Sequence, residues 1–138
     1  MSHSLPVRVY YEDTDAGGVV YHASYLRFAE RGRSEWLRAL GLDHGTLRAG
    51  HGRQIVVRRC RVEFARPARL DDCLIVKTQL IELKGARVRL EQRVERAGTL
   101  LVALEVELAV VDLQGRASRL PGPLREVLQR SHAAARDA

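Results

Sequence analysis

The sequence has no apolar run long enough to cross a membrane. Its longest uninterrupted apolar stretch, Leu100 to Leu104, is far shorter than the roughly 20 residues that a membrane-spanning helix requires. The first residues also lack the apolar centre of a secretory signal, because charged Arg8, Glu12 and Asp13 follow at once. We therefore expect no membrane span and a cytoplasmic location.

Cysteine and aromatic residues are also scarce. Cys60 and Cys73 share no CxxC spacing, and free cysteines are usually buried, which predicts buried thiols rather than a disulfide framework or a zinc site. Aromatic residues make up only 5% of the chain, too few for the stacking platforms of a single-strand nucleic-acid binder. No internal repeat is present, and the length of 138 residues suits one domain, 1–138, whose tail 131–138 we expect to fray.

The chain has more basic than acidic residues, and most of the basic residues are arginines. Basic residues number 23 against 17 acidic ones, a net charge of +6, which raises nucleic acid, a membrane surface or an anionic small molecule as partner. A nucleic-acid-binding module is the alternative suggested by residues 58–61 with Arg66 and Arg69. Glutamates interleave with the arginines on the predicted strand faces, however, and no motif of a known nucleic-acid reader appears, so we expect no nucleic-acid partner.

Hydrophobic periodicity predicts a strand, a long helix, four more strands and a short helix. Residues 5–11 alternate as in a half-buried strand, whereas 21–40 show helical spacing that Gly41 ends. Gly32 inside that helix predicts close approach to a flat surface. After a flexible, glycine-rich stretch, 42–54, alternation marks four strands near 59–64, 74–83, 87–95 and 102–110, and 121–129 predicts a helix.

The simplest fold that buries both surfaces is α+β, with one long antiparallel sheet curled around the long helix. Such a sheet leaves an edge strand unpaired. We therefore expect two copies of the chain to associate edge to edge.

The segment from Tyr11 to His22 holds the densest group of reactive side chains, where the first strand gives way to the long helix. Gly17 and Gly18 allow a sharp turn and close approach of a ligand. The helix start near His22 supplies unpaired N–H groups and the positive end of the helix dipole. A carboxylate such as Asp15 beside these donors can perform acyl chemistry, as nucleophile or as general base.

Three other roles compete for the same carboxylates. A calcium loop beginning at Asp13 would place Ser24 at the twelfth position, where a glutamate belongs, so calcium is excluded. A transition metal held by Asp13, Asp15 and His22 would lack a second His or Cys at a useful spacing, and we expect no metal. A plain helix cap remains the alternative for any single aspartate. The coincidence of Asp15, two glycines and His22 favours chemistry.

The stretch from Tyr11 to Tyr25, continuing to Trp36, resembles the signature of the hotdog-fold acyl-CoA thioesterases. Within that superfamily it is most similar to the Tol-Pal-associated thioesterases, with the 4-hydroxybenzoyl-CoA thioesterases as wider relatives. Phe64 to Asp72 also resembles the family. The resemblance implies the hotdog fold, in which a five-stranded antiparallel sheet wraps a long central helix, here with a short C-terminal helix.

The resemblance places the catalytic residues. The family's catalytic aspartate falls on Asp15, its associated tyrosine on Tyr11 and its histidine at the helix start on His22, whereas Ser24 stands where the family usually has asparagine. The implied reaction is hydrolysis of an acyl-CoA thioester. Attack by Asp15 on the thioester and activation of water by Asp15 both remain open, as does the acyl group.

The resemblance also implies where coenzyme A would bind. Lys84 and Arg87, in the turn at 84–87, and Arg59 and Arg61, on the strand after the helix, are the predicted ligands of its phosphates. Coenzyme A is part of the substrate, so no separate cofactor is expected. A homodimer or a dimer of dimers is expected, and an acyl carrier protein is an alternative donor. A hotdog dehydratase of hydroxyacyl thioesters is the second enzyme alternative, and nothing between Val20 and Leu40 supplies its histidine-centred site.

Overall fold

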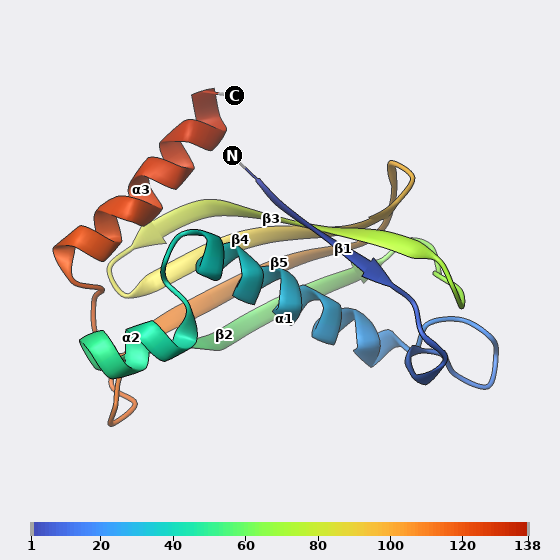
Figure 1. The fold of residues 1–138 in the computed structure, drawn as a ribbon, viewed down its shortest axis with the longest axis horizontal. Coiled ribbons are helices and arrows are strands. Elements are labelled where there is room, and N and C mark those ends of the chain that lie inside the picture. Colours follow the sequence, from blue (N-terminus) through green and yellow to red (C-terminus); the bar gives the residue numbers. More distant parts are fainter. Residues whose placement is uncertain (1, 138) are drawn as a thin grey trace.

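The computed structural model of the chain describes residues 2–137, and the side chains of residues 2–132. Five strands, three helices and one 3₁₀ turn follow one another along it (Figure 1). In chain order they are β1 (His3–Arg8), the 3₁₀ turn η1 (Tyr11–Asp13), α1 (His22–Ala39), α2 (His44–His51), β2 (Arg53–Phe64), β3 (Cys73–Lys84), β4 (Arg87–Arg96), β5 (Thr99–Asp112) and α3 (Gly122–Asp137).

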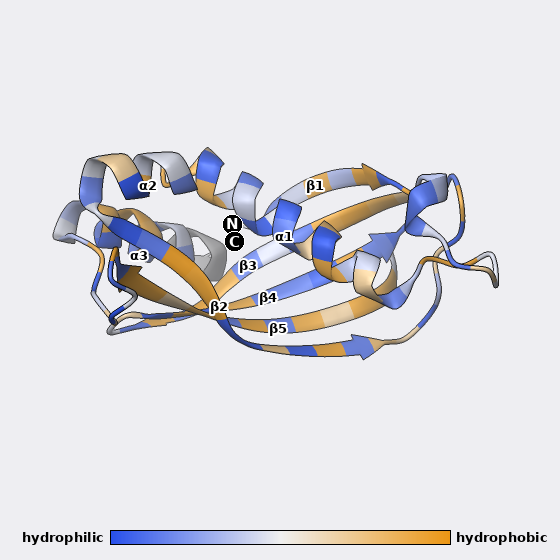
Figure 2. Cartoon of the chain, turned by 90° about the horizontal axis from the view of Figure 1, so that it is seen from below, coloured by the Kyte–Doolittle hydropathy of each residue, from blue (hydrophilic) through white to orange (hydrophobic). Residues whose placement is uncertain are grey.

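The five strands form one sheet in the order β1-β3-β4-β5-β2, and every neighbouring pair is antiparallel. The sheet curves around α1, which lies along its concave face (Figures 1 and 2). Apolar and polar residues alternate along the strands in Figure 2, as a sheet with one covered face requires. The α+β class and the predicted architecture of the hotdog fold, a long helix wrapped by five antiparallel strands, are confirmed.

Helix α1 packs closely on the sheet through a glycine. A β-carbon built at Gly32 would lie 2.6 Å from Cγ1 of Val76 on β3, so a side chain here would displace the helix. On either side, Phe28 and Trp36 are buried against the strands. Gly41, with a φ of +76°, ends the helix in the left-handed conformation. Both predictions made for these glycines are confirmed.

A buried polar seam lies beside this contact. Gln92 is fully buried, and its Nε2 donates to the carbonyl of Ala29 and to Oγ1 of Thr78, both at 2.9 Å. Arg33 donates to Oε1 of Gln92 at 3.0 Å. Burial lowers the pKa of Arg33 below its ordinary value. Because each polar group of Gln92 has a partner, the seam fixes α1 along the sheet without an unsatisfied group.

Three predicted boundaries are wrong. The first strand ends at Arg8 rather than at residue 11, because the N–H of Tyr10 turns to the side chain of Asp13 and η1 begins. The stretch 42–54 contains α2, which Asp43 caps by accepting a hydrogen bond from the N–H of Thr46. Helix α3 continues past residue 129 to Asp137. The predicted fraying of 131–138 lies partly outside the described residues and stays a prediction.

The prediction of buried cysteines is also wrong, since Cys60 and Cys73 are both exposed, free thiols. Cys60 lies on β2, an edge strand that no neighbour covers. The same edge leaves Val56, Val57 and Phe64 between 44% and 52% exposed. Alternation along β2 was predicted correctly, but burial also depends on which strand lies at the edge.

Over the described part of the chain, none of the helices has the length and apolar character needed to span a bilayer.

Candidate active site

Asp15 lies in a short closed loop between β1 and α1. Thr14 pairs with Val20 across the base of this loop, and the N–H of Asp15 donates to the carbonyl of Val19 at 2.9 Å. Oδ1 of Asp15 accepts a hydrogen bond from the N–H of Gly17 at 2.8 Å, while Gly18 takes a φ of +79°. The loop therefore holds an exposed carboxylate in a defined turn, four residues before the extended Val19–Val20 segment that leads into α1.

The start of α1 lies at the same end of the molecule. Thr14–Val20 pairing brings the loop directly before His22, the first residue of the helix. The N–H groups of His22 and Ala23 have no acceptor within the helix, and no side chain caps it. These amides and the helix dipole form a site for negative charge. The structure thus brings Asp15 and His22 to one end of α1, as the sequence predicted.

Aromatic side chains line the approach to His22. Its ring contacts Phe64 edge-on at 6.4 Å between centroids, and Phe64 also lies 5.8 Å from the ring of Tyr25. Phe64 comes from β2 and is 52% exposed. Sequence patterning identified it only as a strand residue, because its proximity to His22 depends on how β2 passes the helix start.

Asp13 connects η1 to the first turns of α1. It is 5% exposed, and its Oδ2 accepts a hydrogen bond from the N–H of Tyr10 at 2.8 Å. Its carbonyl accepts from the N–H of Tyr21 at 2.8 Å and from Oγ of Ser24 at 3.2 Å. Arg27 completes the group, with Nη2 at 2.8 Å from Ser24 Oγ and 3.5 Å from Asp13 Oδ1. Asp13 therefore braces η1 against the start of α1.

The segment 65–72 packs beside the loop of Asp15. The backbone of Arg69 forms an isolated antiparallel β-bridge with Val19, and the N–H of Val20 donates to the carbonyl of Ala68 at 2.8 Å. The N–H of Ala68 in turn donates to the hydroxyl of the buried Tyr25 at 2.9 Å. Burial is the main reason that the pKa of Tyr25 is raised above its ordinary value. Both flanks of the Asp15 loop are therefore fixed to α1.

Tyr11 lies in η1 with 82% of its surface exposed. Its carbonyl accepts hydrogen bonds from the N–H and the hydroxyl of Thr14, and so it contributes to the loop through its backbone. Among the side chains of residues 2–132, its hydroxyl forms no hydrogen bond to Asp15. The predicted orienting role of the Tyr11 hydroxyl stays a prediction.

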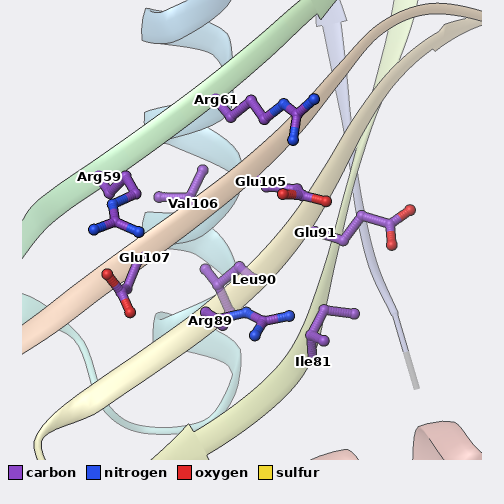
Figure 3. Close-up of a pocket in the computed structure, with 9 residues that line it drawn as sticks. All are labelled: Arg59, Arg61, Ile81, Arg89, Leu90, Glu91, Glu105, Val106 and Glu107. Carbon is purple, nitrogen blue, oxygen red and sulfur yellow. The ribbon is translucent and has the colours of Figure 1, made fainter.

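The four predicted phosphate ligands lie on the face of the sheet away from α1 or at its far end. Arg59 and Arg61 line a shallow depression of about 430 Å³, with α1 behind the sheet (Figure 3). Glutamates 91, 105 and 107 line it too, and Arg61 lies 3.7 Å from Glu63. The depression therefore carries mixed charge rather than a purely cationic surface.

Lys84 and Arg87 pair with each other at the turn between β3 and β4. The opposite end of β3, Cys73, pairs with Arg8 beside the Asp15 loop. Lys84 is the last of the 12 residues of β3 and Cys73 the first, so the two ends lie roughly 36 Å apart. Within one chain the structure does not bring Lys84 and Arg87 to Asp15.

In the described part of the chain, no three His, Cys, Asp or Glu side chains gather as a metal-binding group. Asp13 is bound to Tyr10 and Arg27, and Asp15 to Gly17.

Comparison with known proteins gives a consistent result. Residues 9–130 match the model of the thioesterase-like superfamily. The chain is 49% identical over 110 residues to the acyl-CoA thioesterase YbgC of Haemophilus influenzae, covering 80% of this chain and 81% of that one. It is 49% identical over 108 residues to the acyl-CoA thioester hydrolase YbgC of Escherichia coli O157:H7, covering 78% and 80%.

A solved structure is similar over its whole length. The probable thioesterase from Bartonella henselae superposes with a TM-score of 0.84 at 43% identity, covering 88% of this chain and all of that one.

Proposed function

Because the chain belongs to the thioesterase-like superfamily, we infer that it is an enzyme that hydrolyses acyl-CoA thioesters to a free acid and coenzyme A. The observation that carries this inference is the closed loop of Asp15, set directly before the free amides of α1. The relatives named acyl-CoA thioesterase or thioester hydrolase cover about four fifths of the chain, and they favour hydrolysis over dehydration or nucleic-acid binding.

The helix start would stabilise the charge that develops on the thioester oxygen. When a nucleophile adds to the carbonyl carbon, the oxygen becomes an oxyanion, and the N–H groups of His22 and Ala23 are oriented donors for it. The ring of His22 lies at the same place and would polarise the carbonyl. Loss of one such donor typically reduces the rate about 100- to 1,000-fold.

Asp15 would supply the nucleophile or the general base. In the first route, its carboxylate oxygen bonds to the carbonyl carbon, the carbon–sulfur bond breaks, and water later hydrolyses the mixed anhydride. In the second route, Asp15 takes a proton from water, and the hydroxyl displaces the thiolate. A thiolate leaves readily, so neither route requires strong protonation of the leaving group. Coenzyme A belongs to the substrate, and the scheme uses no separate cofactor.

One single-turnover experiment identifies the nucleophilic route. With enzyme in excess over acyl-CoA in water enriched in ¹⁸O, attack of water on the Asp15 carbonyl of the mixed anhydride places label in the Asp15 carboxylate, and only the nucleophilic route can do so. The general-base route, like attack of water on the acyl carbonyl of the anhydride, places label only in the product acid. Mass spectrometry of the peptide that contains Asp15 reads the result.

The acyl group would lie on the apolar surface beside His22. Phe64, Tyr21 and Leu26 are each more than 40% exposed around the first turns of α1, a larger apolar area than isolated surface residues provide. This surface supports an acyl chain or an aromatic acyl group. Thiol release from a panel of acyl-CoA and acyl-carrier-protein thioesters, compared as kcat/KM, tests the reaction and the donor. No release from any member would contradict the proposed function.

We also propose that two copies pair through β2. This edge is 12 residues long and exposes Val56, Val57 and Phe64, whereas the other edge, β1, has six residues and contains Pro6, a residue that limits edge pairing. Antiparallel pairing of two β2 strands would place Lys84 and Arg87 of a second copy at the Asp15 end. Light scattering tests the mass, and it distinguishes a dimer from a dimer of dimers. A monomer would contradict the proposal.

The cytoplasmic location stays a proposal.

A further inference from the structure

Arg66 and Arg69 are the two arginines of the segment 65–72, and the proposed mechanism gives neither of them a role. Both are exposed, and among the side chains of residues 2–132 neither guanidinium forms a hydrogen bond or an ion pair. Their neighbour Arg96 differs, since its Nη1 lies 2.7 Å from Oδ2 of Asp72. The same Oδ2 also accepts a hydrogen bond from the backbone N–H of Arg69. Asp72 is therefore already paired with Arg96. The charge of Arg69 helps to lower the pKa of Asp72, but the Arg69 guanidinium forms no hydrogen bond with that carboxylate, so its N–H groups can bind another anion.

The fold holds these arginines beside the loop of Asp15. Val19 lies between Asp15 and Arg69. Its carbonyl accepts a hydrogen bond from the N–H of Asp15, and its backbone forms an antiparallel β-bridge with Arg69. The Asp15–Val19 and Val19–Arg69 pairings each correspond to one spacing between neighbouring strands. The backbones of Asp15 and Arg69 therefore lie roughly 10 Å apart. Segment 65–72 is also anchored at Ala68 to Tyr25 and Val20. The arginines therefore project from a fixed segment rather than from a free loop.

The length of the substrate arm decides which cations can reach its phosphates. Between the thioester sulfur and the first phosphorus of coenzyme A lie about 13 covalent bonds, equivalent to roughly four extended residues or ~15 Å. Lys84 of the same chain lies at the far end of β3, roughly 36 Å from the Asp15 end. The Arg69 backbone lies within the span of the arm, and Arg66, held by a hydrogen bond from its N–H to the carbonyl of Leu101, lies three residues away on the same segment. Lys84 and Arg87 can contribute only from a second copy.

We propose that Arg66 and Arg69 bind the diphosphate of the coenzyme A moiety while Asp15 faces the thioester. This proposal rests on the proposed function and adds a binding site to it. Guanidinium groups suit the role because their planar forks donate two parallel hydrogen bonds to phosphate oxygens. The site is exposed, so added salt screens it and weakens binding.

The test compares two thioesters that share acyl group and arm. Acyl-CoA carries the diphosphate, and acylpantetheine does not. We expect Arg66→Gln and Arg69→Gln each to raise KM for acyl-CoA about fivefold, and the double variant to raise it further. KM for acylpantetheine should change less than about twofold, because that substrate has no phosphate to lose. Arg48→Gln, an exposed arginine of α2, is the control with the same change of charge.

Two results would overturn the proposal: an unchanged KM of the double variant for acyl-CoA, or an equal rise for both thioesters. Arg66→Lys and Arg69→Lys, which keep the charge and lose the fork, should fall between the wild type and the glutamine variants. If the wild type hydrolyses neither thioester, the proposed function fails, and calorimetry with coenzyme A itself still decides this site. Weaker binding by the double variant supports the site, and equal binding, or none by the wild type, contradicts it.

Discussion

The hydroxyl oxygen of Tyr25 accepts a hydrogen bond from the backbone N–H of Ala68 at 2.9 Å, across 43 residues of sequence. Both residues are buried, and the bond joins the second turn of α1 to the segment beside Asp15. Tyr25→Phe removes the acceptor and leaves the Ala68 N–H without a partner, which should lower the free energy of unfolding by about 1–3 kcal/mol. Urea denaturation measures it.

Tyr21→Phe is the matched control, because the Tyr21 side chain is 47% exposed and its hydroxyl bonds to none of the described side chains. Equal stability of Tyr25→Phe and Tyr21→Phe would show that the Tyr25–Ala68 bond does not stabilise the fold.

Gly32 tests the contact between α1 and the sheet. In Gly32→Ala the new β-carbon meets Cγ1 of Val76 at 2.6 Å, and overpacking of this kind costs about 1–3 kcal/mol. Gly50→Ala, in α2, meets nothing within 4 Å and should stabilise the protein by about 0.5–1 kcal/mol. Opposite signs in thermal unfolding are expected. A Gly32→Ala variant as stable as the wild type would refute the close contact.

Asp13 tests whether the connection between η1 and α1 matters for catalysis. Asp13→Ala leaves the N–H of Tyr10 without its acceptor and should lower stability by about 1–3 kcal/mol. It should also reduce kcat more than it changes KM, because the Asp15 loop and the α1 amides lose their relative position. Asp13→Asn keeps an oxygen acceptor and should recover much of kcat. Wild-type kcat in a folded Asp13→Ala variant would show that the connection is structural only.

Asp72 tests the electrostatics of segment 65–72 through pH. The hydrogen bond from the Arg69 N–H, together with Arg96, lowers the pKa of Asp72 below its ordinary value. A carboxylate with a lowered folded pKa stabilises the protein above its unfolded pKa, near 4, and this contribution is lost as pH falls through the folded pKa. The stability difference between wild type and Asp72→Asn should therefore be largest above about pH 5 and shrink in acid. A constant difference from pH 7 to pH 3 would contradict this.

Periodicity was sufficient to predict α1 and the existence of all five strands, although the end of β1 was placed too late and the start of β2 too late. Helical spacing located α1 to within one residue at each end, and Gly32 and Gly41 were assigned their roles because a close approach and a helix end require glycine. Helix α2 was missed because three glycines, Gly45, Gly50 and the C-cap Gly52, fall within or directly after its eight residues, and they disfavour a helix more strongly than the Asp43 cap favours one. The burial of Cys60 was wrong because exposure depends on the sheet order, which alternation along one strand does not reveal.

Some residues of the candidate site could likewise be predicted from the sequence, and others could not. Asp15 and His22 are seven residues apart, and local turn chemistry brings them to one end of α1. Phe64 and Arg69 approach them only through tertiary pairing, and so no local pattern could identify them. Lys84 and Arg87 were assigned by resemblance, and the length of β3 places them at the far end of the same chain.

The most direct test of the central claim is thiol release from acyl-CoA by Asp15→Asn. The asparagine oxygen can still accept the hydrogen bond from the N–H of Gly17, now made at 2.8 Å, so the loop should be retained while the carboxylate is lost. We predict an unchanged melting temperature and a kcat reduced at least about 1,000-fold. A folded Asp15→Asn variant with kcat within a few fold of the wild type would contradict the assignment of Asp15 and the mechanism built on it.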